Sequence, residues 1–538
     1  MSEPVVRIRD LTIALPKGAD RPHAVEGLNL DLEPGKILCV VGESGSGKSM
    51  SAYALTGLLP RALKPTAGSI LFEGRDLLTL DEPAWRRLRG RRVAMVFQEP
   101  MTALNPVMRI GDQIAEMFEA HNLLTRAERR ARAVALATEV GLPNPGEAVR
   151  AYPHQLSGGQ RQRAMIAMAL ALEPSVLVAD EPTTALDVTT QAQILRLVRD
   201  LQRKRGMSVL FITHDFGVVA EIADHVAVLQ RGRLVESGTA EAVLRDPEAP
   251  YTKALLAAVP RLTPPPRLPV EAAPVALSVS RLSKTYAGRS GLFGKPRVVA
   301  AVQDVSFDVR RGETLGIVGE SGSGKSTTAR LAIRLIEPDG GTVRLGDLDY
   351  TALKGGDLRD KRSRIQMIFQ DPFASLNPRR TVEQIITAGP IAHGVPAAEA
   401  RARARSLLDL VGLDPKAAAR YPNAFSGGQR QRIGIARALA MEPDVLVADE
   451  AVSALDVSVQ RQVLDLLEDL KRRLSLAMLF ITHDLRVAAT ICDRIAVMHR
   501  GAVVEMRGTA DLFAAPEHAY TRSLLAAVPG IHARAQVS

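Results

Sequence analysis

Residues 42–49, GESGSGKS, combine residue types and a spacing that suit the binding of phosphate groups, and the same letters recur at residues 319–326. The pattern G-x-x-x-x-G-K-[ST] lets backbone N–H groups turn onto phosphate oxygens without a Cβ in the way. Lys48 and Lys325 are predicted to reach these oxygens. A glycine-rich turn without a ligand is the alternative, and it does not explain why the stretch occurs twice.

Both copies lie between an apolar run and a helix-compatible segment. The runs at 37–41 and 315–318 have the pattern of buried parallel strands, and the segments at 50–59 and 327–335 would add a positive helix end to each loop. The hydroxyls of Ser49 and Ser326 are predicted to hold Mg²⁺. The predicted nucleotide-binding positions in the loops are Gly42, Glu43, Ser44, Gly45, Ser46, Gly47, Lys48, Ser49, Gly319, Glu320, Ser321, Gly322, Ser323, Gly324, Lys325, Ser326 and Thr327.

Two acidic pairs each end a second apolar strand. Asp180 and Asp449 come first in these pairs, and an aspartate at such a strand end suits the ordering of Mg²⁺ through its water shell. Glu181 and Glu450 follow and point to the other side of the strand end. From there each can accept a proton from the water that attacks the γ-phosphate, so these two glutamates are the predicted general bases.

A glutamine and a histidine end further strands in each half. The amides of Gln98 and Gln370 are predicted to reach both Mg²⁺ and the attacking water, with surface glutamines as the alternative. His214 and His483 occur in the repeated sequence Ile-Thr-His-Asp and are predicted to sense the γ-phosphate or to orient the base. A satisfied polar histidine is the alternative for each.

A second glycine-rich turn begins a helix in each half, although no phosphate loop in the same half needs it. Its residues are Ser157, Gly158, Gly159, Gln160, Ser426, Gly427, Gly428 and Gln429. A helix N-terminus attracts anions. If the halves pack head to tail, each turn closes the other half's nucleotide from the opposite side, which predicts an intrachain pseudo-dimer with two composite sites.

Composition limits the class of protein. The chain has 538 residues, 46% of them hydrophobic and 24% charged, and no run of 18 or more apolar residues that would span a bilayer. Its 2 cysteines favour a reducing compartment and exclude a disulfide framework. The net charge of +10 suits a nucleotide, an acidic lipid surface or nucleic acid equally well. A cytoplasmic protein without a membrane span is the expectation.

The chain repeats itself with an offset of about 270 residues. Lys48 recurs as Lys325 and Glu181 as Glu450, which predicts one fold used twice. Six prolines between Pro260 and Pro274 predict a stiff, extended linker. The predicted domains are therefore residues 1–260 and 275–538, joined by a linker at 261–274. The arginine-rich segment at 123–140 is predicted to be an amphipathic helix with a solvated face, not a nucleic-acid patch.

The ordered motifs resemble those of tandem ATP-binding-cassette ATPases over nearly the whole chain. Walker A, glutamine loop, S-G-G-Q signature, Walker B with its glutamate, A-L-D loop (185–187 and 454–456) and switch histidine occur in this order in both halves. The resemblance implies an α/β fold with two P-loop NTPase (RecA-like) cassettes, each with an antiparallel β subdomain and a helical subdomain. It also implies hydrolysis of ATP with Mg²⁺ at both sites.

A narrower resemblance links the chain to the dipeptide/oligopeptide/nickel importer ATPases. It rests on residues 99–106 and 371–378, which follow the glutamines, and on residues 251–260 and 520–529, which close the halves. The first half is similar to the D-type subunit of that family and the second to the F-type. This implies two integral-membrane permease subunits, a periplasmic substrate-binding protein, a peripheral place on the cytoplasmic side of the inner membrane, and no nucleic acid. The cargo stays open among dipeptides, oligopeptides, nickel, glutathione and peptide antibiotics.

The halves depart from each other at two places. Tyr286 lies where the family stacks an aromatic ring on adenine, whereas the first half has Leu15, so weaker nucleotide binding is expected in the first site. Ala451 and Val452 replace Pro182 and Thr183, which is expected to soften the turn but to leave the carboxylates in place.

Cassette proteins of other classes are alternatives to the importer. A tandem cassette acting on ribosomes typically has a long charged arm instead of a proline linker. A DNA-repair cassette protein has zinc-binding cysteines, and a sugar importer usually has one degraded site.

Overall fold

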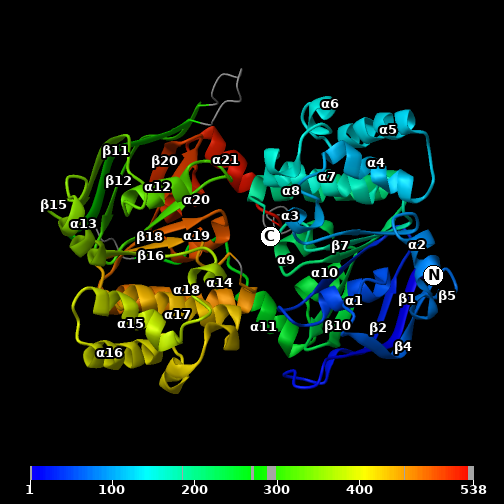
Figure 1. Cartoon of the computed structure of the whole chain (residues 1–538), viewed down its shortest axis with the longest axis horizontal. Helices are drawn as coiled ribbons and strands as arrows, with labels where there is room; N and C mark the ends of the chain where they lie inside the picture. Colours follow the sequence, from blue (N-terminus) through cyan, green and yellow to red (C-terminus); the bar gives the residue numbers. More distant parts are fainter. Residues whose placement is uncertain (1–2, 185, 268–271, 288–297, 454, 531–538) are drawn as a thin grey trace. The chain divides into compact units, whose positions relative to one another are not determined.

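The computed structural model describes residues 3–184, 186–267, 272–287, 298–453 and 455–530. The chain divides into two compact units, Met1–Val259 with Val528–Ser538 and Pro260–Ala527 (Figure 1). The first unit carries the first phosphate loop and the second unit carries the other. Ala185 and Ala454 of the A-L-D loops, and residues 268–271 of the predicted linker, lie outside the described residues.

A six-stranded sheet forms the centre of each unit, and its strand order is the same in both. The orders are β10-β9-β3-β8-β7-β6 and β20-β19-β13-β18-β17-β16, with the last five strands of each parallel and the first antiparallel to its neighbour. The strands of the first unit are β10 (Arg233–Thr239), β9 (His225–Gln230), β3 (Ile37–Val41), β8 (Ser208–Ile212), β7 (Val176–Asp180) and β6 (Val93–Val96). Those of the second are β20 (Ala502–Gly508), β19 (Arg494–His499), β13 (Thr314–Val318), β18 (Ala477–Thr482), β17 (Val445–Asp449) and β16 (Ile365–Ile368).

The continuous apolar runs explain these central strands. Every residue of β3 and β13 is buried, as expected of parallel strands covered on both faces. In an open sheet of this kind ligands bind beyond the carboxyl ends of the strands. The phosphate loop, the acidic pair, the glutamine and the histidine all follow such ends, so the sheet gathers them at one edge.

A second, antiparallel sheet of four strands completes each unit, with the orders β2-β1-β4-β5 and β12-β11-β14-β15. Its strands are β2 (His23–Leu32), β1 (Val6–Ala14), β4 (Lys64–Phe72), β5 (Arg75–Asp76), β12 (Val298–Arg310), β11 (Val275–Ala287), β14 (Gly340–Leu345) and β15 (Leu348–Asp349). Side chains in β1 alternate between buried and less buried positions, which matches the alternation in the sequence. The predicted antiparallel β subdomains are confirmed.

Helices cover the sheets and form a separate group at one end of each unit (Figure 1). The helices of the first unit are α1 (Lys48–Thr56), η1 (Leu77–Thr79), α2 (Glu82–Leu88), α3 (Pro100–Ala103), α4 (Ile110–Ala120), α5 (Arg126–Glu139), α6 (Pro145–Ala148), η2 (Pro153–Gln155), α7 (Gly158–Ala169), α8 (Val188–Arg205), α9 (Phe216–Ile222), α10 (Ala240–Arg245) and α11 (Pro250–Ala258). Those of the second are α12 (Lys325–Ala332), α13 (Gly355–Lys361), η3 (Arg362–Arg364), α14 (Pro372–Ser375), α15 (Val382–Ala392), α16 (Ala397–Leu410), η4 (Pro415–Ala419), η5 (Pro422–Ala424), α17 (Gly427–Leu439), α18 (Val457–Leu474), α19 (Leu485–Ile491), α20 (Thr509–Ala514) and α21 (Ala519–Ala526).

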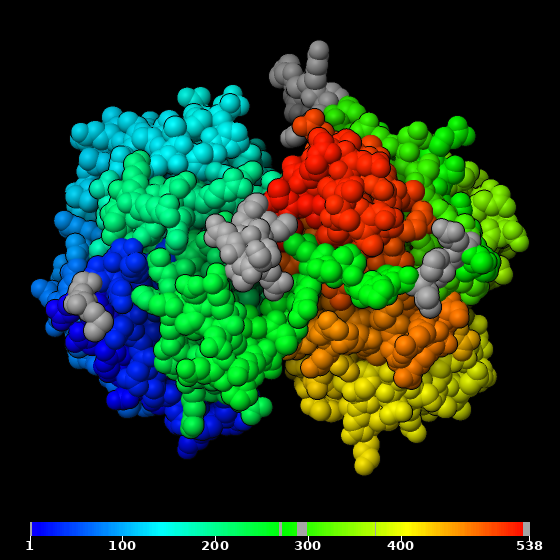
Figure 2. All heavy atoms as spheres, turned by 180° about the vertical axis from the view of Figure 1, so that it is seen from behind, coloured from blue at the N-terminus to red at the C-terminus, as the bar shows by residue number. Residues whose placement is uncertain are grey.

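In the sequence, the separate helical group extends from the glutamine through the helix that begins at the second glycine-rich turn. Its main helices are α4, α5 and α7 in the first unit and α15, α16 and α17 in the second. Figure 2 shows the group of the second unit, in yellow, at one end of that unit. Helix α5 falls within the predicted segment 123–140 and begins with a capping box formed by Thr125 and Glu128. None of the described helices is long and apolar enough to cross a membrane.

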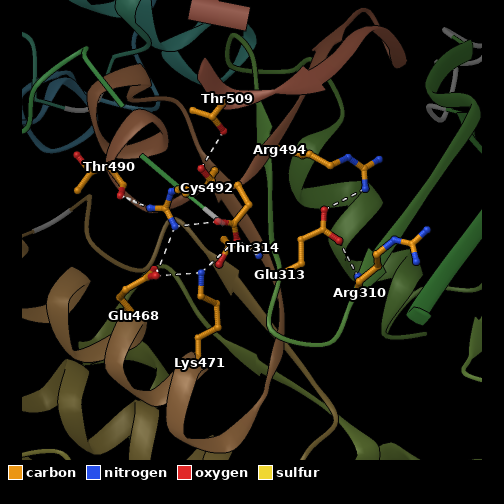
Figure 3. A network of polar contacts seen from close by, with 11 residues as sticks. Arg310, Glu313, Thr314, Glu468, Lys471, Thr490, Cys492, Arg494 and Thr509 are labelled. Atoms are coloured by element: carbon orange, nitrogen blue, oxygen red, sulfur yellow. Dashed lines mark hydrogen bonds and ion pairs between the residues drawn. The ribbon is translucent and has the colours of Figure 1, made fainter. Parts of the chain in front are cut away.

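Part of the proline-rich segment is attached to the second unit by Arg267. Its guanidinium donates to Asp493 Oδ1 at 2.9 Å and to the carbonyl of Thr490. Lys471 donates to the other oxygen of Asp493 at 3.1 Å, and so does the backbone N–H of Thr314, at 2.7 Å. Figure 3 shows this network between α18, α19 and the start of β13. The side chains of Arg267 and Asp493 are 15% and 12% exposed, so the contact is a largely buried ion pair.

Candidate functional site

The phosphate loop follows β3 and requires glycine at two positions for steric reasons. Gly42 has a φ of 146°, and a Cβ there would lie 2.1 Å from the carbonyl oxygen of Leu229. At Gly47, with a φ of 100°, a Cβ would lie 2.6 Å from the carbonyl oxygen of Ala24. Any side chain would therefore push the loop away from β9 and β2.

The lysine of each loop is buried against the loop's own backbone. Lys48 Nζ donates to the carbonyls of Gly42 at 2.7 Å and Glu43 at 2.9 Å. Lys325 Nζ makes the same contacts in the second loop, with both distances 2.7 Å. Because these bonds fold the long side chain back over the loop, its ammonium group stays where the predicted phosphates would lie.

Buried hydroxyls inside the loops fit an anionic ligand. Ser46 Oγ and Ser323 Oγ are buried, and neither has a hydrogen-bond partner within the described part of the chain. An unsatisfied buried hydroxyl is costly, and a phosphate oxygen would accept its proton. The loops therefore fit a nucleoside phosphate in both units.

The serine that follows each lysine contacts the aspartate that ends the second buried strand. Ser49 Oγ donates to Asp180 Oδ1 at 3.0 Å, and Ser326 Oγ to Asp449 Oδ1 at 3.0 Å. Asp180 Oδ2 is buried and has no hydrogen-bond partner among the residues that the structure describes. Burial raises the pKa of both aspartates, and the serine hydrogen bonds only partly oppose this. A hydroxyl and a carboxylate with an unsatisfied oxygen are hard oxygen donors that fit Mg²⁺.

Glu181 lies in the left-handed region of the backbone, with a φ of 45°, and three side chains meet at one of its oxygens. Glu181 Oε2 accepts hydrogen bonds from Gln98 Nε2 at 3.1 Å and Thr184 Oγ1 at 2.9 Å, and His214 Nδ1 lies 3.3 Å away. Burial raises the pKa of Glu181, but the hydrogen bond and charge of His214, with Lys48 and Thr184, outweigh burial and lower the pKa to about 2. The carboxylate is therefore ionised at neutral pH.

Glu450 repeats this arrangement with two differences, since the glutamine and the histidine contact different oxygens and the hydroxyl contact is not repeated. Gln370 Nε2 donates to its Oε2 at 2.7 Å, and His483 Nδ1 lies 3.2 Å from its Oε1. Ser453, the counterpart of Thr184, instead donates to the backbone carbonyl of Glu450 at 3.0 Å. Burial raises the pKa of Glu450, but the hydrogen bond and charge of His483 outweigh it, so the pKa is lowered. The backbone N–H of Glu450 donates to the carbonyl of Ile481 at 2.9 Å, as that of Glu181 does to the carbonyl of Ile212 at 3.0 Å, so both glutamates keep the same contact with the neighbouring strand.

The second glycine-rich turn caps a helix in each unit. Ser157 Oγ accepts from the N–H of Gln160 at 3.3 Å, and the Gln160 side chain accepts from the N–H of Ser157 at 2.9 Å, at the start of α7. Ser426 and Gln429 form the same box at α17. A Cβ at Gly159 would lie 2.4 Å from Thr190 Cγ2, and one at Gly428 would lie 2.2 Å from Val459 Cγ1, so these glycines also let two helices pack closely. Gly158 and Gly427 form the first helical positions.

The sequence matches the ABC transporter family at residues 25–184 and 302–453, which include both phosphate loops and both acidic pairs. The chain belongs to this family. Each unit therefore contains an ABC cassette, and the chain is an ATPase. A second family, the oligopeptide/dipeptide transporter C-terminal region, matches residues 235–289 and 504–538.

Two curated relatives match this ABC protein over nearly its whole length. The "Peptidoglycan transport ATP-binding protein YejF" of Agrobacterium fabrum is 47% identical over 99% of this chain and 98% of its own. The "Glutathione import ATP-binding protein GsiA" of Escherichia coli O157:H7 is 48% identical over 98% of this chain and 89% of its own. The solved ATP-binding cassette MJ0796, as a dimer bound to ADP and Pi, is 30% identical over 43% of this chain and 98% of its own, with a TM-score of 0.39.

The remaining predicted position of the ABC site is Tyr286, near the end of β11. Its side chain is 41% exposed, and it pairs with Val299 of β12. Leu15, its first-cassette counterpart, follows β1 directly and packs against the core of its own cassette.

Three contributors to the ABC sites are missing from the sequence-based predictions. Thr184 is one, and its position three residues after Glu181 on a tight turn was a usable signal. The other two are Tyr251 and Tyr520, whose hydroxyls accept hydrogen bonds from the backbone N–H of Glu43 and Glu320. Nothing in the sequence signals that contact, because the tyrosines lie about 200 residues from the loops.

Proposed function

We propose that this protein is the ATP-hydrolysing subunit of an importer for peptides or peptide-like molecules. The observation that carries the proposal is the match of both halves to the oligopeptide/dipeptide transporter C-terminal region, next to two complete cassettes. The relatives named for glutathione import and peptidoglycan transport support the same substrate class.

The proposed partners are two integral-membrane permease subunits and a periplasmic substrate-binding protein. None of the described helices spans a membrane, so in this proposal the passage for the cargo belongs to the permeases. The chain would lie on the cytoplasmic side of the inner membrane and dock its helical segments, which follow Gln98 and Gln370, against them. These segments lie at one end of each cassette (Figure 1).

In the proposed mechanism, Lys48 and Lys325 hold the phosphates of ATP, and the buried serines of the loops donate to phosphate oxygens. Ser49, Asp180 and Gln98, and in the second cassette Ser326, Asp449 and Gln370, would hold Mg²⁺. That ion would neutralise charge that develops on the phosphates during transfer.

Glu181 and Glu450 are the proposed general bases for the attacking water. A carboxylate with a pKa of about 2 is a weak base, and part of the depression at Glu181 comes from Lys48 and His214. The negative charge of the γ-phosphate would compensate these cations and raise the basicity of the glutamate once ATP is bound. His214 and His483, which contact the glutamates, would orient the base and report the γ-phosphate.

The phosphate loop of each cassette does not need the signature residues of the same cassette, which are Ser157 to Gln160 in the first and Ser426 to Gln429 in the second. We propose that each N-terminus of α7 and α17 binds the nucleotide held by the other cassette. ATP would then join the two cassettes, and hydrolysis would separate them.

Uptake by a deletion strain tests the importer proposal. Cells that lack this chain should lose uptake of at least one member of a labelled panel of glutathione, dipeptides, oligopeptides and muropeptides. The wild-type chain should restore uptake, and the Glu181→Gln/Glu450→Gln protein should not. Co-sedimentation with ribosomes together with unchanged uptake of the whole panel would contradict the proposal.

A further inference from the structure

The peptide unit between Gly42 and Glu43 is held at both of its polar ends. Its carbonyl accepts from Lys48 Nζ at 2.7 Å, and its N–H donates to the Tyr251 hydroxyl at 3.4 Å. Since the C=O and N–H of a trans peptide are fixed in one plane, the direction of one determines the direction of the other. The tyrosine therefore helps to set the carbonyl that anchors the lysine.

The second cassette repeats this arrangement with different neighbours. The peptide between Gly319 and Glu320 accepts from Lys325 Nζ at 2.7 Å and donates to the Tyr520 hydroxyl at 3.2 Å. The ring of Tyr520 also contacts the ring of His499, with 4.0 Å between their centroids. The repetition of the bond in two sequences with different surroundings argues against a chance contact.

Both tyrosines come from the segment that matches the oligopeptide/dipeptide transporter C-terminal region. Tyr251 is near the start of α11, and Tyr520 is near the start of α21. A glutamate of the preceding strand fixes each helix start. Glu236 accepts from the N–H of Glu248 at 2.7 Å and of Ala249 at 3.2 Å.

Glu505 performs the same task in the second cassette, where it accepts from the N–H of Glu517 at 2.9 Å and of His518 at 3.0 Å. Hydrogen bonds from backbone N–H groups to a carboxylate are charge-assisted and strong. They therefore fix the helix that presents each tyrosine.

We propose that Tyr251 and Tyr520 are positioning residues for ATP binding, through which the C-terminal region of each half orients the phosphate-loop peptide that anchors the lysine. The path runs from Glu236 to the start of α11, to Tyr251, to the Gly42–Glu43 peptide and to Lys48. The proposal concerns the ATPase sites and does not depend on which cargo is imported.

Steady-state ATP hydrolysis by the purified full-length chain tests this inference. Lys48 holds phosphate in both the ground state and the transition state, so a misplaced lysine weakens both to a similar degree. The Tyr251→Phe/Tyr520→Phe protein should therefore show a KM for ATP that is about three- to tenfold higher, with kcat changed less than about twofold. A wild-type KM would overturn the proposal.

Tyr350→Phe is the matched control. Tyr350 is fully buried in the second cassette, and its hydroxyl donates to the carbonyl of Ile333 at 3.4 Å, away from the phosphate loop. This variant should lower the melting temperature without changing the KM. The rise in melting temperature on adding ATP gives a second readout, which should shrink in the Tyr251→Phe/Tyr520→Phe protein and stay unchanged in the control. If both proteins lost only thermal stability and kept the same response to ATP, Tyr251 and Tyr520 would be structural residues alone.

Discussion

The two cassettes bring together the same predicted catalytic side chains but secure them with different neighbours. Glu181 accepts a third hydrogen bond from Thr184, whereas the hydroxyl of Ser453 is used by the backbone of Glu450. Both glutamates keep a glutamine contact, a histidine contact and a backbone hydrogen bond to the neighbouring strand. The hydroxyl contact to the carboxylate is present only at Glu181 among these two glutamates.

A second difference concerns the aspartate after α9 and α19. Asp224 accepts from the N–H of Ile37 at 2.8 Å and lies 3.8 Å from Arg199, which is on α8. In the second cassette Glu468 replaces that arginine, and Arg267, from the segment before β11, pairs with Asp493 together with Lys471 of α18. The arginine that its own helix provides in the first cassette thus comes from the connecting segment in the second.

The largest expected effect is a loss of ATP turnover, and it tests whether the two ATPase sites are equivalent. Glu181→Gln and Glu450→Gln should each lower ATP turnover sharply, because a positioned general base contributes about 10²- to 10⁴-fold to the rate. The double variant should accumulate with ATP bound. Measurement of kcat for both single variants is decisive, with Glu241→Gln as the control, since its carboxylate is 72% exposed and pairs with surface Arg245. A Glu450→Gln protein with wild-type turnover would show that the sites differ in function.

A smaller effect, on ATP affinity, is expected from substitutions of Tyr286 and of Leu15, its counterpart without an aromatic ring in the first cassette. Tyr286→Leu should weaken ATP binding to the second site about tenfold, because stacking of a base on an aromatic ring contributes about 1–3 kcal/mol. Leu15→Tyr should strengthen binding to the first site. Titration with a fluorescent ATP analogue, in the Glu181→Gln/Glu450→Gln background that prevents turnover, measures both. Equal affinities in all variants would mean that adenine does not stack on Tyr286.

Substitutions of the arginines that pair with Asp493 and Asp224 test whether the connecting segment stabilises the second cassette. Arg267→Ala should destabilise the second cassette by about 1–3 kcal/mol, since Lys471 still contacts the partly uncompensated carboxylate. This loss of stability should appear as faster hydrogen exchange at the N–H of Thr314, which donates to Asp493.

Arg267→Ala combined with Glu468→Arg should recover stability, because it restores the arrangement of the first cassette. Arg199→Ala is the control and should speed exchange at Ile37 instead. If Arg267→Ala left exchange at Thr314 unchanged, the connecting segment would not stabilise this cassette.

The smallest expected effect is a shift in the titration of His483. Burial lowers its pKa, but the hydrogen bond and charge of Glu450 outweigh burial, so the pKa is raised above its usual 6.5. A raised folded-state pKa stabilises the cassette fully below the unfolded pKa, and this stabilisation is lost as pH rises through the folded pKa. NMR of labelled histidine should show a pKa above 6.5 that falls in the Glu450→Gln protein. No change on that substitution would mean that the pair does not form in solution.

Much of the fold was predictable because its signals are local. The buried runs at 37–41 and 315–318 lie in β3 and β13. The contacts of Ser49 with Asp180 and of Gln98 with Glu181 bring together residues for which the sequence predicted roles around one nucleotide and its Mg²⁺. The sequence-based roles of these residues, and the domain boundaries at 260 and 275, stay predictions.

What the sequence by itself determined is the chemistry: two sets of phosphate loop, aspartate, glutamate, glutamine and histidine, in an order typical of one ATPase fold used twice. Only the tertiary structure decided that Tyr251 contacts the phosphate loop and that Arg267 pairs with Asp493. Motif residues follow strands whose parallel arrangement fixes where they meet. Tyr251 and Arg267 contact partners about 200 residues away, and only the packing of a folded cassette specifies such pairs.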